Sequence, residues 1–451
     1  MMTDLYTKFI RGVRWNTFEA ISYYALYSLH NIALFAILEP GVYGLSGTIL
    51  SLLYLTVMIT NIGFDQTIGP FFSYYSSSRD SFKHLFLYQL VIQMVLLGLS
   101  GTFLVGLLGS WFSTYQLISV GTGSVIVATV ISEGVKRSTR TLMQVSFKNK
   151  ATSLIEVTSM ILYGSIVWSW YLLVGQITIP VLLSALLISS LAGLMSIGTL
   201  TMRWYQYLPA QASTRYTQSI RNRIIKSRLV SWAYGITQQL FSSNTIIPLI
   251  ATHAGLQQAG TFTMINSLVS SITGIFNKIA GYPSLAALAH TKYQSIPVKQ
   301  ETFRFISTEI MNIMYSIGLF IAINRHTLIT RQALKGASPD LIVPIYLYIG
   351  IILLEYAIIG YEKFYLNEEK PEYLVGMHIG IIAIACGIIM TGSSWGLTTI
   401  LGTLACIRIL SFVALAALSY RHWGIRPSLK VKPLYLIISA LSALIFLLIA
   451  R

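Results

Sequence analysis

Charged residues are scarce in this sequence. Asp, Glu, Lys and Arg make up 10% of its 451 residues, whereas soluble domains carry about 25%. Because 54% of the residues are hydrophobic, water cannot be the solvent for most of the chain. Cysteine is also rare, since only Cys386 and Cys406 occur and both fall in apolar runs. This excludes a disulfide scaffold and a thiolate metal site with the usual spacing.

Motifs of known catalytic chemistry are also missing. The sequence has no Gly-rich phosphate loop of Walker type, no His/Glu metal-binding spacing and no nucleophile elbow. An ATP-driven pump is therefore excluded, and we expect a protein that is not an enzyme and that holds no metal or cofactor.

Long apolar runs, by contrast, recur along the whole chain. A helix needs about 20 mostly apolar residues to cross a bilayer, because its backbone must satisfy its own hydrogen bonds there. The runs predict an all-α, polytopic transmembrane protein of about 12–13 helices. The first run follows basic residues as a secretory signal does, but its length indicates a retained helix. The predicted spans are 15–38, 42–64, 85–108, 115–133, 152–174, 178–200, 229–251, 258–282, 302–324, 341–361, 373–391, 396–418 and 433–450.

Basic residues outnumber acidic ones, 31 to 15, and the formal net charge is +16. Most lie in alternate connections between the predicted spans, beginning with the N-terminus. The positive-inside rule then predicts a cytoplasmic N-terminus and an inner (cytoplasmic) membrane location. Topology and attraction to anionic lipid headgroups explain most of the charge, so no nucleic-acid partner is expected. The opposite connections hold only Arg325, Arg331, Lys335 and the terminal Arg451.

The longest polar connection divides the predicted helices into two sets. We expect an N-terminal six-helix lobe over 1–202, a basic cytoplasmic linker over 203–228 and a C-terminal six-helix lobe over 229–420. Residues 421–451 would add a cytoplasmic turn and one more helix. Two six-helix sets that start on the same side are typical of parallel repeats.

Two predicted helices carry polar residues at intervals of three and four, which places them on one helix face. Such a face avoids lipid, so it lines a water-filled cavity or hydrogen-bonds to neighbouring helices. Two stripes at related places in the two halves favour a shared central cavity. The first stripe is Asn16, Glu19, Tyr23, Tyr27, His30 and Asn31, and the second is Thr263, Asn266, Ser270, Thr273 and Asn277.

Ionisable residues inside the spans are candidates for function. Arg408 lies near the middle of its span, where it either pairs with Glu355 or faces the cavity. Lys278 lies about one turn from a span end, so it either binds substrate or extends to the interface. Glu19 is on the first stripe above Arg11 and Arg14, and is a candidate ion site. Carboxylates near the cytoplasmic ends of spans are commonly paired with loop arginines. The carboxylates predicted to lie at such ends are Glu19, Asp65, Glu133, Glu156 and Glu309.

One segment carries a family resemblance. Leu38, Glu39, Pro40, Gly41, Val42, Tyr43 and Gly44 precede an apolar span that closes with Asn61, Ile62, Gly63, Phe64 and Asp65. This resembles the polysaccharide transporter family, the Wzx-like oligosaccharide flippases of the multidrug/oligosaccharidyl-lipid/polysaccharide (MOP) exporter superfamily. In that family a Gly-Pro-x-x-Phe/Tyr-Gly turn follows the first helix and an acidic-Gly pair ends the second. Here Pro precedes Gly, and Asp65 follows Gly63.

The resemblance implies two lobes around a central cavity, as in multidrug exporters and the lipid II flippase, with alternating access. It also implies an undecaprenyl-pyrophosphate-linked oligosaccharide as substrate, an O-antigen or capsule repeat unit. We expect a monomer in the bilayer that works with a glycan polymerase and other assembly proteins, coupled to H⁺ or Na⁺ through Glu19 and Asp65. The expected substrate-binding residues are Arg11, Arg14, Tyr23, Tyr27, Asn31, Asn266, Asn277, Lys278 and Arg408.

Two other functions remain open. A drug or metabolite exporter of the same superfamily would have a more apolar or acidic cavity. A membrane glycan polymerase would need a large outer loop with catalytic residues, and only 324–340 is long enough to serve.

Overall fold

The structure is a computed structural model of the chain. It describes residues 2–68, 71–111, 119–210, 218–239, 242–267, 295–323, 342–367, 371–390, 396–425 and parts of 432–444. All regular structure within these ranges is helical, which confirms the all-α prediction. The chain divides into two compact units: unit one is Met1–His30 with Val42–Pro248, and unit two is Asn31–Gly41 with Leu249–Arg451.

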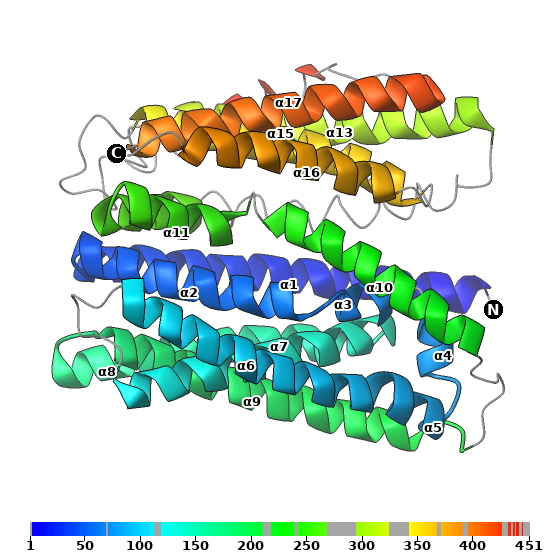
Figure 1. The fold of residues 1–451 in the computed structure, drawn as a ribbon, viewed down its shortest axis with the longest axis horizontal. Coiled ribbons are helices and arrows are strands. Elements are labelled where there is room, and N and C mark those ends of the chain that lie inside the picture. The colour runs from blue at the N-terminus through cyan, green and yellow to red at the C-terminus, as the bar shows by residue number, and fades with distance from the viewer. Residues whose placement is uncertain are drawn as a thin grey trace. The chain divides into compact units, whose positions relative to one another are not determined.

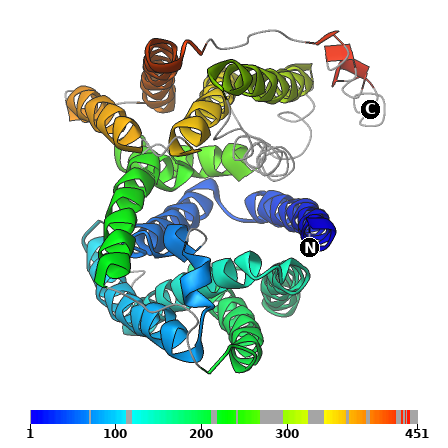
Figure 2. The same ribbon diagram turned by 90° about the vertical axis from the view of Figure 1, so that its right-hand side faces the viewer.

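Unit one contains the helices of the first half of the sequence, except that residues 31–41 of α1 and α2 and residues 249–253 of α11 belong to unit two (Figure 1). α7 packs against α6 and α9, and α8 packs against α9. Figure 2 looks along these helices, coloured blue to green, and shows them grouped as a bundle. The elements are α1 (Met2–Ile37), α2 (Pro40–Thr60), α3 (Phe64–Ile68), α4 (Phe72–Tyr75), α5 (Arg79–Phe82), the π-helical turn η1 (Lys83–Leu87), α6 (Tyr88–Trp111), α7 (Val120–Val145), α8 (Asn149–Val174), α9 (Ile179–Gln206), α10 (Gln218–Gln239) and α11 (Ser243–His253).

Unit two contains the rest of the chain, with α15 packed against α13 and α17, and α16 packed against α17 (Figure 1). Its described elements are helical residues 256–267, α13 (Ile296–Ile323), α15 (Ile342–Asn367), α16 (Pro371–Met390) and α17 (Leu397–Trp423). The second polar stripe is described only as far as Ser267. The predicted outer loop at 324–340 lies outside the described residues, as does most of the predicted thirteenth span.

Several helices are suited to a membrane. Among the described residues, 6 helices are long and apolar enough to cross one. On α6 the exposed residues Val91, Val95, Leu99 and Phe103 follow one another at intervals of four, and Phe103 is 73% exposed. Such an apolar stripe would be unstable against water but suits lipid. The six helices are Arg14–Ile37, Pro40–Thr60, Arg79–Trp111, Asn149–Val174, Ile179–Gln206 and Leu397–Trp423.

The helix ends differ from expectation in two places. α7 continues to Val145, about three turns beyond the predicted span end, so Lys136, Arg137 and Arg140 are helical rather than part of a connection. The predicted span 229–251 is covered by two helices, α10 and α11, and α10 already begins at Gln218. In the extended turns, Arg137, Arg140 and Arg228 find partners within unit one, which hydropathy alone does not reveal.

One end of unit one is closed by an aromatic cluster of Phe64, Phe71, Tyr75, Phe82 and Phe86. Arg228 of α10 packs on this cluster, and its guanidinium lies 4.9 Å from the centre of the Phe64 ring. Arg228 also donates hydrogen bonds to Thr67 (3.3 Å), Gln89 (2.6 Å) and Tyr75 (3.0 Å). Gly63 is required here, because it has a φ of +69° and an added Cβ would lie 2.2 Å from the carbonyl oxygen of Arg228.

Candidate functional site

Glu19 of α1 is the best-defined of the predicted site residues. Its side chain is 3% exposed and forms an ion pair with Arg140 of α7. Ser153 of α8 donates a hydrogen bond of 3.0 Å to the other carboxylate oxygen. Glu156, one turn further along α8, lies 3.7 Å from the guanidinium of Arg140. Helix α1 therefore meets the consecutive helices α7 and α8 at this carboxylate.

A second ion pair lies one turn earlier on α7. The ammonium of Lys136 is 2.7 Å from Glu133, and both side chains are nearly buried, at 10% and 12% exposed. Gly193 of α9 leaves room for the lysine stem, because a Cβ there would lie 3.2 Å from Lys136 Cδ and 2.8 Å from Ser159 Oγ. We refer to Glu19, Glu133, Lys136, Arg140 and Glu156 as the Glu19 cluster.

The charges of the Glu19 cluster do not balance. It contains three carboxylates and two cations, so it carries one net negative charge when all its groups are ionised. Burying a net charge is costly, and a bound proton or monovalent cation would lower that cost. One Glu156 oxygen is buried with no hydrogen-bond donor among the described residues. Within the same part of the chain, no group of three His, Cys, Asp or Glu side chains is placed to hold a metal ion.

Asp65, the other predicted ion site, is in a different setting. It pairs with Arg137 at 2.8 Å and accepts a hydrogen bond of 2.7 Å from Ser138. Ser138 also lies within hydrogen-bond distance of Gln93 (3.1 Å) and Asn61 (3.3 Å). The Asp65–Arg137 pair is neutral as a unit. The expectation that such carboxylates meet basic residues is confirmed for Glu19 and Asp65, but the arginines belong to a helix and not to a loop.

The rest of the first stripe is partly engaged inside unit one. Trp168 of α8 donates a hydrogen bond of 3.1 Å to Nδ1 of His30, which is 6% exposed. Interhelical bonding therefore accounts for Glu19 and His30. Tyr23 and Tyr27 are half-buried and stack on each other, with ring centres 6.2 Å apart and planes 7° from parallel. Asn31 is buried at the point where α1 passes from unit one to unit two.

Neither Arg14 nor Arg11 forms an ion pair with Glu19, although the sequence places them about one and two turns before it on the same helix. Both side chains are exposed. Arg11 lines a separate cavity with residues of the α7–α8 turn, and Arg14 does not line that cavity.

Unit two places its predicted residues within its own helix packing. Asn266 is 8% exposed and accepts a hydrogen bond from the Tyr348 hydroxyl. Arg408, 4% exposed, lies 3.5 Å from Glu355, so the predicted pairing of these two residues is present. Asn277 and Lys278 lie outside the described residues.

Sequence reasoning missed two charged features. It counted Lys136 and Arg140 as loop residues, although both belong to the Glu19 cluster. It did not single out Glu362 and His378, whose Oε1 and Nε2 atoms lie 3.3 Å apart with both side chains at most 5% exposed. The available signal was the interval of seven between Glu355 and Glu362 on a largely apolar helix, which places both on one face.

Comparison with known proteins gives a consistent result for the fold. No protein-family profile matches the sequence, and no curated protein matches it. An outward-facing multidrug resistance transporter of the MATE family and MOP superfamily superposes with a TM-score of 0.67, at 11% identity, over 92% of this chain and 95% of that one. The chain therefore has the same all-α fold as this transporter.

Other solved structures agree with this assignment. The lipid II flippase MurJ, in an inward closed conformation, superposes with a TM-score of 0.62 at 11% identity, over 96% of this chain and 91% of that one. A MOP transporter from Pyrococcus furiosus, described as having a binding pocket of reverse polarity, gives a TM-score of 0.57 at 11% identity over 96% and 95%. The MOP fold thus includes both exporters and a flippase.

Proposed function

We propose that the chain is a secondary transporter that flips an undecaprenyl-pyrophosphate-linked oligosaccharide from the cytoplasmic to the outer leaflet. Its charge supports a polyanionic substrate, because 31 basic residues face only 15 acidic ones. The MOP fold supports transport by alternating access, and MurJ is a flippase with this fold. An O-antigen or capsule repeat unit carries the required pyrophosphate, which cations bind well.

The proposed substrate residues divide by chemistry. Arg14, Lys278 and Arg408 would attract the pyrophosphate or acidic sugars, whereas Arg11 lines a separate cavity. The stacked rings of Tyr23 and Tyr27 offer a face for sugar rings. Amide side chains would hydrogen-bond to sugar hydroxyls, and these are Asn31, Asn266 and Asn277.

The Glu19 cluster is the observation that carries the coupling part of the proposal. Its excess carboxylate gives a proton or Na⁺ a reason to bind, and its position across α1, α7 and α8 links that binding to helix packing. Asp65 is the second candidate, although an ion that binds there competes with Arg137 at 2.8 Å. An ion at Glu19 likewise competes with Arg140, but Glu156 offers that arginine a second carboxylate.

The cellular setting follows from the same proposal. The protein would be a monomer in a bacterial inner membrane with a cytoplasmic N-terminus. A glycan polymerase and other assembly proteins would act on its product. No catalytic role is assigned to it.

Reconstitution in liposomes tests the proposal. A fluorescent undecaprenyl-pyrophosphate oligosaccharide in the outer leaflet is quenched by a reagent added outside, and flipping protects part of the signal. We expect transport that depends on an imposed H⁺ or Na⁺ gradient. Glu19→Gln should abolish the gradient dependence, whereas Glu301→Gln, a change at an exposed position on α13, should not.

Three outcomes would overturn parts of the proposal. Efflux of organic cations without any lipid flipping would identify a drug or metabolite exporter instead. Unchanged gradient dependence in Glu19→Gln would remove Glu19 from the coupling mechanism. Sugar chain growth in the same liposomes would revive the polymerase alternative and contradict the non-enzymatic assignment.

A further inference from the structure

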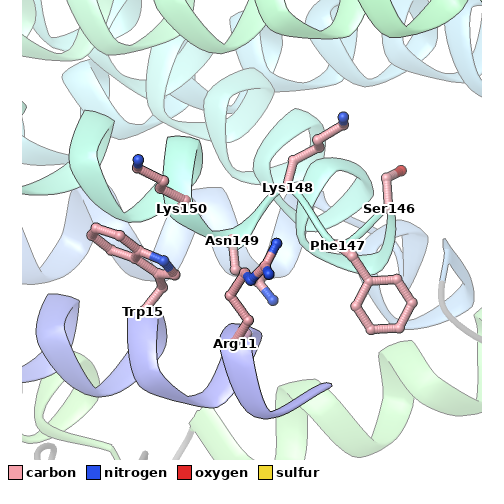
Figure 3. A pocket seen from close by; sticks show the side chains of 8 residues that line it. Arg11, Trp15, Ser146, Phe147, Lys148, Asn149 and Lys150 are labelled. Carbon is pink, nitrogen blue, oxygen red and sulfur yellow. The ribbon is translucent and has the colours of Figure 1, made fainter. Parts of the chain in front are cut away.

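A cavity of about 300 Å³ lies at one end of unit one, away from the Glu19 cluster. Its volume is at the lower limit of the 300–1,000 Å³ common for small-molecule sites. Figure 3 shows Arg11 and Trp15 projecting from α1 toward the turn between α7 and α8, where Lys148 and Lys150 lie on either side of Asn149. We refer to this site as the Arg11 pocket.

Every charged side chain that lines the Arg11 pocket is basic. Three of its lining side chains are cations, and none is a carboxylate. Within the part of the chain that the structure describes, Arg11 and Lys148 form no ion pair. The ammonium of Lys150 lies 5.4 Å from the centre of the Trp15 ring, which positions it at the pocket wall. An anion would therefore find charge that is not already neutralised.

Asn149 and the start of α8 add uncharged donors. Asn149 is 9% exposed, lines the pocket and has no hydrogen bond from its amide to another described residue. It is the first residue of the 26-residue helix α8, whose N-terminus has no side-chain cap. Uncapped backbone N–H groups at a helix N-terminus favour anions. The close approach of α1 depends on Gly12, because a Cβ there would lie 2.4 Å from the Asn149 amide nitrogen.

The position of the pocket indicates where its ligand resides. It lies at a turn between two long helices, so it is at the level of the membrane interface and not at the bilayer centre. Phe147, in the same turn, is 48% exposed and is held in the left-handed region at φ +59°. Exposed aromatic side chains beside Trp15 suit the headgroup region, where aromatic residues gather.

We propose that the Arg11 pocket binds the phosphate group of an anionic lipid headgroup in the leaflet that contacts the α7–α8 turn. Arg11, Lys148 and Lys150 supply charge, Asn149 and the α8 N-terminus supply hydrogen bonds, and Trp15 and Phe147 lie against the upper acyl chains. This site is independent of the transported substrate. A bound lipid would fasten α1 to the α7–α8 turn, because both elements contribute to the pocket.

Lipid binding to the purified full-length protein tests the proposal by native mass spectrometry. The probes are phosphatidic acid, diacylglycerol with the same acyl chains and inorganic phosphate. We expect phosphatidic acid to bind wild type at least about tenfold more tightly than the Arg11→Ala/Lys148→Ala variant, because each lost charge-assisted hydrogen bond contributes about 1.5–3 kcal/mol. Arg14→Ala removes an exposed arginine of α1 outside the pocket and should bind like wild type.

Conservative substitution separates lost charge from lost folding. Arg11→Lys/Lys148→Arg keeps both charges and should retain most of the binding. Equal affinity of wild type and the double alanine variant would overturn the proposal. Equal binding of diacylglycerol, or displacement of the lipid by inorganic phosphate at the same concentration, would also contradict it, since the ligand would then not be a lipid phosphate. Liposome transport is not measured, so this result and the flippase test are separate.

Discussion

Arg140 is the residue whose removal should most disturb unit one. It pairs with Glu19 and lies 3.7 Å from Glu156, and both carboxylates are less than 10% exposed. Arg140→Ala would leave three carboxylates with Lys136 as the one cation of the Glu19 cluster. Breaking a buried pair by removing one partner costs about 3–5 kcal/mol. Because the Arg140 side chain is 25% exposed, we expect a value near the lower limit, about 3 kcal/mol.

A double-mutant cycle isolates the charge effect. Glu19→Gln alone should cost about 1 kcal/mol, because it removes one charged hydrogen bond but leaves Glu156 as a partner for Arg140. The Glu19→Gln/Arg140→Ala variant restores the net charge of the cluster to its wild-type value. It should therefore be more stable than Arg140→Ala alone, with a coupling of about 1–2 kcal/mol, in the range found for residues in contact.

Thermal unfolding in detergent, followed by tryptophan fluorescence, measures the order of the four proteins. Arg203→Ala serves as the control, because Arg203 is an exposed arginine on α9 and surface substitutions usually change stability by about 0.5 kcal/mol or less. If the double variant unfolds at or below the temperature of Arg140→Ala, the buried charge imbalance is not the cause. If the unfolding temperature falls as far in Arg203→Ala as in Arg140→Ala, the reasoning is refuted as well.

Two further changes test the packing at the closed end of unit one. Gly63→Ala should be clearly destabilising, because its Cβ would lie 2.2 Å from the Arg228 carbonyl oxygen. Gly175→Ala should cost only about 1–2 kcal/mol, because Gly175 has a similar φ of +79° but nothing within 4 Å of an added Cβ. Equal unfolding temperatures for the two variants would contradict the clash at Gly63. Arg79 donates hydrogen bonds to the carbonyl oxygens of Gln206 (2.7 Å) and Leu208 (3.2 Å). Arg79→Ala should therefore lower the free energy of unfolding by about 1 kcal/mol and speed proteolysis near residues 207–210. Lys83→Ala, a change at an exposed position, should do neither. Identical cleavage rates in the two variants would show that Arg79 does not hold this end of α9.

The helical architecture could be predicted from the sequence because lipid imposes a single requirement on every span. Each crossing segment needs about 20 apolar residues with an internally bonded backbone, and this requirement appears directly as an apolar run. The ends of α8, α9 and α16 accordingly lie within a few residues of prediction on at least one side. The end of α7 does not, since polar residues can extend a helix wherever neighbours provide partners.

Glu19 shows how much of the site the sequence determined by itself. Helical spacing placed it on a polar face above Arg11 and Arg14, so it could be singled out without a structure. Its partners Arg140 and Ser153 lie more than 120 residues away, and periodicity says which face a residue occupies but not which helix packs against that face. Glu362 with His378, and Arg11 with Lys148, depend in the same way on which helices pack together. Local composition determined the membrane helices, whereas only the tertiary structure decided which charges meet, because those contacts depend on the packing of distant segments.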